Sequence, residues 1–128
     1  MLAISAKANQ FGRRRARYAV LQDGEITYYE VGLPQDCYAD AQAECVAIIS
    51  ACKHIADMQV SGSPKIITTS QLLIKQLSGE WKVKPDTYHA AIFPTMREGV
   101  ELVSAELKTP TTPTEIHLLN SLKKNFKV

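Results

Sequence analysis

The residues of this chain that could do chemistry are one carboxylate in an apolar helix, hydroxyls after a buried strand, and basic residues near a tryptophan. Glu44 lies in "AECVAIISAC" (43–52), Thr69 lies near the end of the apolar, β-branched run "KIITTS" (65–70), and Trp81 precedes two lysines in "WKVK" (81–84). The segment "RRRAR" (13–17) holds four arginines in five residues. Carboxylate oxygens are ligands for hard cations, and guanidinium groups bind phosphates in bidentate fashion. These residue types indicate metal or phosphate chemistry.

Composition places the chain among ordinary globular proteins. It has 128 residues, of which 45% are hydrophobic and 22% charged, with a net charge of +2, and this length suits one domain over 1–128. No apolar run approaches the roughly 20 residues of a membrane helix, and no signal segment opens the chain, so we expect a cytoplasmic protein without a membrane partner. Cys37, Cys45 and Cys52 lack CxxC spacing, which argues against a disulfide framework and a zinc site.

Periodicity and turn residues predict the order β-β-β-α-β-α-α-β-α, that is, an α/β domain with a mixed sheet. The expected strands cover 1–8, two runs within 17–32, 65–70 and 100–107, and the expected helices cover 40–59, 71–77, part of 81–99 and 115–126. Asp23-Gly24 predicts a tight hairpin turn because type I′ turns need positive φ. Asp36 or Asp40 is the expected N-cap of the long helix, and Thr114 that of the last helix.

This order, with three of its passages, resembles the ribonuclease H-like superfamily, especially the plant-type, reverse-transcriptase-like branch. "AECVAIISAC" is similar to the family's Ala-Glu-x-x-Ala helix, and "VELVSAEL" (100–107) is similar to its fifth strand. "IITTSQLLIKQLSGEWKVK" (66–84) is similar to its strand and Asp-Ser helix, followed by Gly-Glu-Trp-Lys-Val-Lys. The resemblance covers nearly the whole chain and implies a five-stranded mixed sheet, its first three strands antiparallel, flanked by helices.

The resemblance also locates the catalytic positions. Family members that cleave the RNA strand of RNA–DNA hybrids hold two Mg²⁺ ions with carboxylates on strand 1, the long helix, strand 4 and the last helix. Glu44 matches the helix acid, whereas Ser5, Thr69 and His117 stand at the other three positions. With one acid retained, we expect no metal site, no cofactor and a non-catalytic protein, Mg²⁺ or Mn²⁺ being needed only if activity is retained. Glu44 would then be hydrogen-bonded to Thr69 or Ser5.

The favoured hypothesis is a catalytically degenerate ribonuclease H-like module, a pseudoenzyme that binds an RNA–DNA hybrid or duplex without cutting it. Trp81 would stack on a base or sugar, while basic residues would touch phosphates. The expected phosphate contacts are Arg13, Arg14, Arg15, Arg17, Lys82 and Lys84.

Two alternatives remain open at this level. In the first, the fold is a scaffold for protein interaction or assembly, and the arginines meet an acidic partner. In the second, a metal-dependent ribonuclease H-type endonuclease survives through an atypical metal at Glu44 and His117. The sequence leaves monomer and dimer unresolved, because the first hairpin or the fifth strand could pair between subunits.

Overall fold

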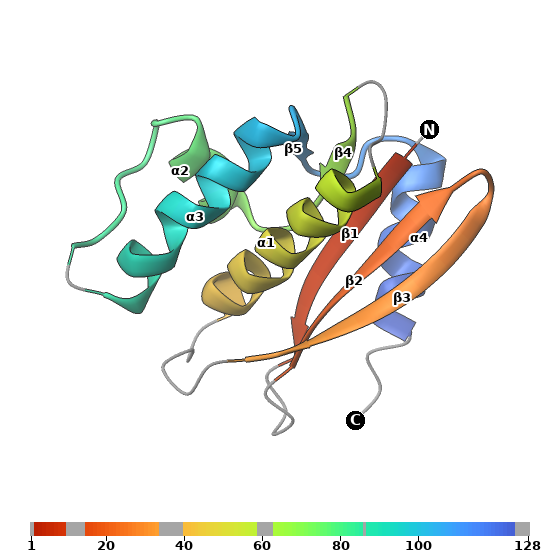
Figure 1. The fold of residues 1–128 in the computed structure, drawn as a ribbon, viewed down its shortest axis with the longest axis horizontal. Helices are drawn as coiled ribbons and strands as arrows, with labels where there is room; N and C mark the ends of the chain where they lie inside the picture. The colour runs from red at the N-terminus through yellow and green to blue at the C-terminus, as the bar shows by residue number, and fades with distance from the viewer. Residues whose placement is uncertain (1, 10–14, 34–39, 59–62, 86, 125–128) are drawn as a thin grey trace.

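The computed structural model describes residues 2–9, 15–33, 40–58, 63–85 and 87–124, and Figure 1 shows the chain path. The strands are β1 (Leu2–Asn9), β2 (Arg15–Gln22), β3 (Glu25–Gly32), β4 (Lys65–Ile67) and β5 (Glu106–Lys108). The helices are α1 (Asp40–Met58), α2 (Gln71–Leu77), α3 (Tyr88–Leu102) and α4 (Pro113–Lys124). The order of strands and helices is the one predicted. None of the described helices has the length and apolar character needed to cross a membrane.

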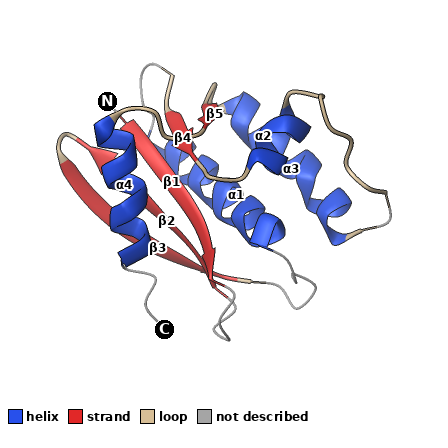
Figure 2. Ribbon diagram, turned by 180° about the vertical axis from the view of Figure 1, so that it is seen from behind, coloured by secondary structure: helices blue, strands red, loops and turns tan. Residues whose placement is uncertain are grey.

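The strands form one sheet in the order β3-β2-β1-β4-β5. The pairs β1–β2 and β2–β3 are antiparallel, and the pairs β1–β4 and β4–β5 are parallel. Helices α1 and α3 lie over one face, whereas α4 lies alone over the other, as the view from behind shows (Figure 2). The sheet is therefore the middle layer of the molecule, and any surface on α4 is separated by it from any surface on α1.

The β2–β3 hairpin has the tight turn predicted at Asp23-Gly24. Asp23 has φ of 53° and Gly24 has φ of 83°, as a two-residue turn with two left-handed positions requires. Gln22 pairs with Glu25 on either side of the turn. This turn fixes the register of the whole β2–β3 ladder.

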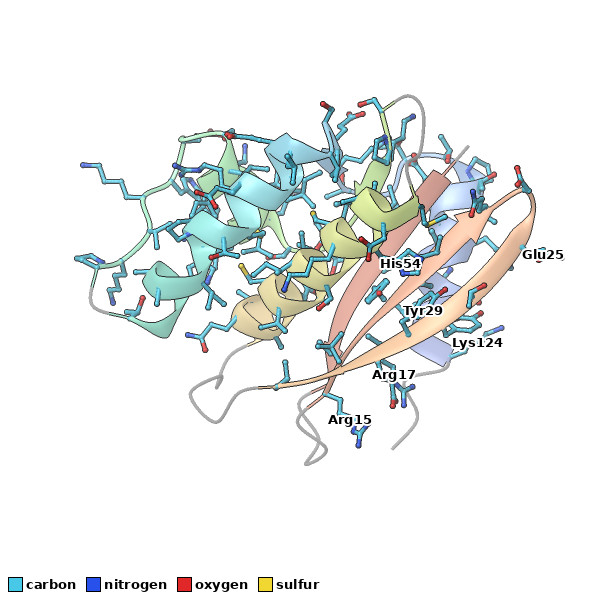
Figure 3. The ribbon with its side chains drawn as sticks, in the orientation of Figure 1. Arg15, Arg17, Glu25, Tyr29, His54 and Lys124 are labelled. Atoms are coloured by element: carbon cyan, nitrogen blue, oxygen red, sulfur yellow. The ribbon has the colours of Figure 1, made fainter. Side chains whose placement is uncertain are left out.

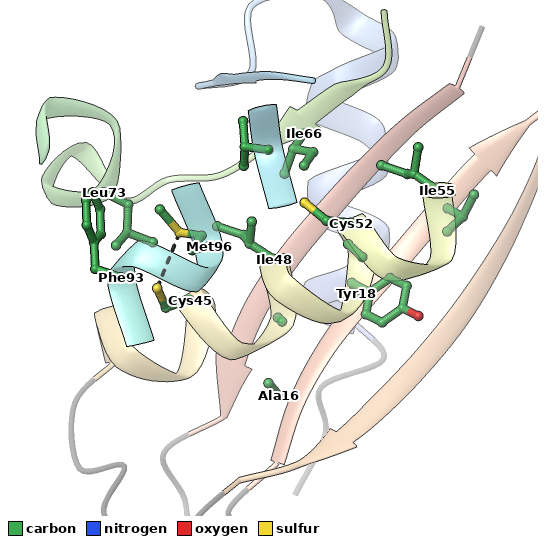
Figure 4. Close-up of a cluster of buried hydrophobic side chains, with 14 residues drawn as sticks. Ala16, Tyr18, Cys45, Ile48, Cys52, Ile55, Ile66, Leu73, Phe93 and Met96 are labelled. Atoms are coloured by element: carbon green, nitrogen blue, oxygen red, sulfur yellow. Dashed lines mark hydrogen bonds between the residues drawn. The ribbon is translucent and has the colours of Figure 1, made fainter. Parts of the chain in front are cut away.

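Strand β2 divides the core by the alternation of its side chains. Its residues Ala16, Tyr18 and Val20 pack with α1 and α3, whereas Ala19 packs with α4. Helix α1 supplies side chains at helical spacing to the larger cluster, where Cys45 Sγ lies 3.3 Å from Met96 Sδ (Figure 4). The buried members contributed by α1 are Cys45, Ala47, Ile48, Ala51, Cys52 and Ile55.

Helices α1 and α3 approach closely at a glycine. A Cβ built on Gly99 would lie 3.1 Å from the Cβ of Cys52, which is tighter than ordinary packing. Burial raises the pKa of the Cys52 thiol to about 11. Cys45 and Cys52 are thus both free, buried packing residues.

The predicted strand over 100–107 is wrong over most of its length. Residues 100–102 continue α3, and only Glu106–Lys108 form β5. The alternating pattern misled because Val100 also stands at helical spacing from Phe93 and Met96, and all three are buried in one cluster. The helical stretch itself begins late, at Tyr88, where the Thr87 hydroxyl accepts a hydrogen bond from the N–H of Ala90 at 3.1 Å.

The predicted N-cap of the last helix is also wrong, because Thr112, and not Thr114, caps α4. Glu115 N–H donates to Thr112 Oγ1 at 3.2 Å, and Thr112 N–H donates to Glu115 Oε1 at 3.2 Å, which is a capping box. Thr114 lies inside α4.

The Glu115 carboxylate is buried, with 1% of the residue exposed, and holds α4 to the sheet. Lys108 Nζ of β5 lies 3.1 Å from Glu115 Oε1, and Thr111 N–H donates to the same oxygen at 2.9 Å. The N–H of Thr111, together with Lys108 and Thr112, lowers the pKa of Glu115 to about 2.

We expect Glu115→Gln to lower the free energy of unfolding at pH 7 by about 1–3 kcal/mol, because the variant loses hydrogen bonds to a charged group. The carboxylate stabilises the native state above its unfolded pKa of 4.5, and this contribution is lost as the pH falls toward about 2. Denaturant unfolding between pH 7 and pH 2 should give a flatter acid limb for the variant than for the wild type. Glu101→Gln, on the exposed side of α3, should keep the wild-type acid limb; equal flattening in both variants would contradict the assignment.

Candidate functional site

The retained acid Glu44 is joined to the end of β4 by a buried hydrogen bond. The Thr68 hydroxyl donates to Glu44 Oε2 at 3.0 Å. Only 4% of Glu44 and 0% of Thr68 are exposed. The same hydroxyl accepts the N–H of Ser70 at 3.1 Å, and Ser70 is the N-cap of α2. One threonine thus connects α1, the sheet and α2.

The hydrogen bond to Glu44 comes from Thr68, the neighbour of Thr69, which was expected as a partner together with Ser5. Thr68 N–H donates to the carbonyl of Lys108 at 2.9 Å, so the extended chain continues one residue beyond β4. Side chains alternate along an extended chain, and since Thr68 points inward, Thr69 points outward and is exposed. The hydroxyl at the family's strand 4 position therefore faces solvent, and its neighbour occupies the interior.

Of the other two acid positions, the structure describes the backbone alone at Ser5 and the side chain as well at His117. The backbone of Ser5 pairs with Ile67 on β4, one residue before Thr68. His117 is exposed on α4 and lines a cavity of about 560 Å³ with the β2–β3 turn, including Asp23 and Gly24. His117 thus lies beside the β2–β3 turn and Glu44 beside the end of β4, and the described residues include no group of three or more His, Cys, Asp or Glu side chains to complete the proposed atypical metal site.

The described residues do not fit a two-metal centre. Among them, no group of three or more His, Cys, Asp or Glu side chains is placed to hold a metal ion. The Glu44 carboxylate accepts from Thr68, and the Glu115 carboxylate is neutralised by Lys108. Magnesium needs several converging oxygen ligands, which these two separate carboxylates do not supply.

A groove between α2 and α3 contains the predicted tryptophan and one predicted lysine. Its volume is about 480 Å³, and its lining includes Gln76, Trp81, Lys82, Phe93 and Arg97. Trp81 is 47% exposed. The Arg97 guanidinium lies 5.0 Å from the centroid of the Phe93 ring. Aromatic surface and positive charge are therefore adjacent in one groove, a combination suited to a base and its phosphate.

A buried polar pair supports the loop that carries Trp81. Gln76 Oε1 lies 2.7 Å from His89 Nε2, and Gln76 Nε2 donates to the carbonyl of Lys82 at 3.5 Å. Burial lowers the pKa of His89, so its ring is neutral at pH 7 and donates through Nε2 to Gln76. The backbone N–H of Trp81 donates to the backbone carbonyl of Lys75 at 3.1 Å. The loop is thus tied to α2 on both sides of the indole.

Arg97, Gln76 and His89 were missed by the sequence analysis. Phe93 and Arg97 stand four residues apart on α3, and this spacing alone indicates that the two side chains are neighbours. The meeting of Gln76 with His89 depends on how α2 packs beside α3, for which the sequence carries no local signal.

The described arginines of the basic run lie on the other side of the sheet. Arg15 Nη1 lies 3.1 Å from Glu30 Oε2, and Arg17, directly opposite Glu30 in the ladder, forms a second ion pair with it. Hydrogen bonding from Arg17 lowers the pKa of Glu30. Arg15 and Arg17 share the strand face of Ala19, which packs on α4, and lie toward the start of β2 (Figure 3). Arg13 and Arg14 fall outside the described residues.

The predicted nucleic-acid contacts therefore occupy two surfaces. Trp81 and Lys82 lie in the groove of α2 and α3, and Lys84 is exposed on the same loop. Arg15 and Arg17 lie across the sheet, with 54% and 13% of their side chains exposed. Arg15 is the more accessible of the two to a partner.

We expect Thr68→Val to reduce the free energy of unfolding by about 1–3 kcal/mol, because Glu44 loses a buried donor while the side chain keeps its shape. Thr69→Val is the matched control, and its exposed position limits the change to about 0.5 kcal/mol. Urea unfolding of both variants, of Glu44→Gln and of each double variant measures the coupling free energy between Glu44 and each threonine. Equal losses for the two threonines, or additive effects of Thr68→Val and Glu44→Gln, would contradict the pairing.

Neither a protein-family model nor a curated protein matches the sequence. Solved structures do match the fold. The ribonuclease H1 of the halophilic archaeon Halobacterium salinarum NRC-1 has a TM-score of 0.68 and 20% identity, covering 94% of this chain and 92% of that chain. LC11-RNase H1, solved with an RNA/DNA hybrid, has a TM-score of 0.65 and 15% identity, covering 99% and 100% of the two chains.

A viral structure extends the comparison to larger proteins. The foamy viral protease-reverse transcriptase, also solved with an RNA/DNA hybrid, has a TM-score of 0.63 and 16% identity, covering 94% of this chain and 18% of that chain. These neighbours confirm the resemblance expected from the sequence. The chain has a ribonuclease H-like α/β fold.

Proposed function

We propose that this chain is a non-catalytic module that binds nucleic acid, an RNA–DNA hybrid or a duplex, through the groove of α2 and α3. The observation that carries the proposal is the exposed indole of Trp81 in a groove that also contains Lys82 and Arg97. Two structural neighbours, LC11-RNase H1 and the foamy viral protease-reverse transcriptase, were solved with RNA/DNA hybrids, which supports this choice of ligand.

Each groove residue has a distinct role in the proposal. Trp81 stacks on a base or sugar, because an aromatic face accepts any base and needs no sequence-specific hydrogen bonds. Lys82 and Arg97 bind phosphates flanking that nucleotide, and Lys84 extends the contact along the backbone. Arg15 forms a separate phosphate-binding surface across the sheet, and Arg13 and Arg14, its neighbours in the sequence, are further phosphate contacts in this proposal.

The absence of cleavage is part of the proposal and is supported by the state of the candidate acids. Glu44 accepts a hydrogen bond from the buried Thr68 hydroxyl. The other three acid positions of the family are occupied by Ser5, Thr69 and His117, none of which has a carboxylate. Phosphoryl transfer by two metal ions needs acids around both ions.

The experiment is a binding and cleavage assay on one fluorescently labelled RNA–DNA hybrid, with Mg²⁺ or Mn²⁺ present, at two salt concentrations. We expect salt-sensitive binding and an intact hybrid. Trp81→Ala should weaken binding by about 1–3 kcal/mol, a rise in Kd of about 5- to 150-fold. Lys82→Ala and Arg97→Gln should each reduce the slope of log K against log salt by about 1.

The controls separate the groove from other surfaces. Lys53→Ala removes an exposed lysine from the second half of α1, outside the groove, and should leave the binding slope close to that of the wild type. Arg15→Ala measures the surface across the sheet. Metal-dependent cleavage that disappears in Glu44→Gln would establish a residual ribonuclease H and refute the proposal. Absence of binding at low salt would refute it as well, and would favour the protein-interaction module.

A further inference from the structure

Among the described residues, strand β3 ends the sheet and lacks several of the features that protect edge strands. Within the described residues it pairs with β2 alone, and Figure 1 shows it as the outermost strand. It runs for eight residues, "EITYYEVG", and contains no proline, lysine or arginine. Natural edge strands are normally short, bulged, basic or interrupted by proline, because unpaired backbone groups pair readily with another chain. The sequence of β3 is instead rich in aromatic and β-branched residues, which favour pairing.

The free edge exposes the backbone groups of alternate residues. Gln22 and Glu25 close the two-residue turn as a hydrogen-bonded pair, so Glu25, Thr27 and Tyr29 direct their N–H and C=O groups toward β2. The N–H and C=O groups of Ile26, Tyr28 and Glu30 therefore point away from the sheet. An added antiparallel strand would meet these three residues.

Charge permits a second β3 at this edge. The only charged residues of the strand are Glu25 and Glu30, and Glu30 is already paired with Arg15 and Arg17 of its own chain. In antiparallel pairing centred on Tyr28, Ile26 lies opposite Glu30 and Glu25 lies opposite Val31. No two carboxylates face each other, so self-pairing carries no direct like-charge repulsion.

Both faces of β3 carry aromatic surface that a second copy would cover. Tyr28 is 39% exposed and contacts Ser121 of α4. On the opposite face, the Tyr29 ring stacks on Tyr18 at 5.0 Å and meets the edge of His54 at 4.6 Å. A two-fold axis perpendicular to the sheet keeps each face on its own side, so a partner strand would bring the same aromatic residues to the same faces.

We propose that two copies of this chain associate by antiparallel pairing of their β3 edges, with a two-fold axis at Tyr28. Thr27 then lies against Tyr29 of the partner subunit, and the two sheets form one continuous sheet. The interface does not use the groove of α2 and α3, so this proposal stands independently of nucleic-acid binding.

The test is sedimentation velocity of the full chain over a range of micromolar concentrations. The wild type should change from monomer to dimer as concentration rises. Tyr28→Lys and Tyr28→Glu place like charges across the axis, and each should raise the dimer dissociation constant at least about tenfold. An equimolar mixture of the two variants should recover the dimer, because lysine then faces glutamate, and this recovery also shows that both variants fold.

Two further results decide the proposal. Leu102→Lys removes a large apolar side chain, 80% exposed on α3, and should leave the dimer unchanged. A wild type that stays monomeric throughout would overturn the proposal. So would charge variants that dimerise as the wild type does, a mixture that does not recover, or dissociation caused by Leu102→Lys.

Discussion

The arrangement of this domain depends on one hydroxyl group. Thr68 donates to Glu44 and accepts from the N–H of Ser70, and in doing so it fixes the long helix, the end of the central parallel strands and the start of α2 relative to one another. A buried carboxylate is costly without donors, and a buried threonine side chain is costly without partners. Each satisfies the other, so a buried hydrogen bond joins the three elements at this point.

The position of the groove follows from that junction. Helix α2 starts at Ser70, directly after Thr68, and its far end leads into the loop of Trp81 and Lys82. Gln76 and His89 then hold this loop against α3, which brings Phe93 and Arg97 to the other wall. The part of the chain that is similar to a catalytic strand and helix thus supports this groove. The same elements that position metal-binding acids in a nuclease can position an indole and two cations here.

The sequence predicted the features that depend on local patterns. The Asp23-Gly24 turn, the apolar face of α1 and the order of strands and helices each follow from neighbouring residues. Even the pairing of Arg17 with Glu30 was within reach, since a two-residue turn fixes the register of the hairpin. The capping box of Thr112 and Glu115 is also a sequence pattern, and it was overlooked in favour of Thr114.

The remaining differences have tertiary causes. The choice between Thr68 and Thr69 depends on where pairing with β5 stops, and β5 itself was misplaced because Val100 fits both a strand and a helix pattern. The separation of His117 from Glu44 depends on which face of the sheet α4 covers. The predicted basic surface was divided because side chains alternate along β2, which sends Arg15 and Arg17 to the face of the sheet that α4 covers.

The close contact of α3 with α1 at Gly99 has a consequence for the response of this domain to oxidants. Thiols react with peroxides and disulfides as thiolates, and burial of Cys52 keeps its pKa at about 11, so very little thiolate forms at neutral pH. Cys45 is equally enclosed and directs its sulfur to Met96. Burial at the interface of α1 and α3 therefore suppresses thiolate formation at Cys52 and protects this thiol from oxidants.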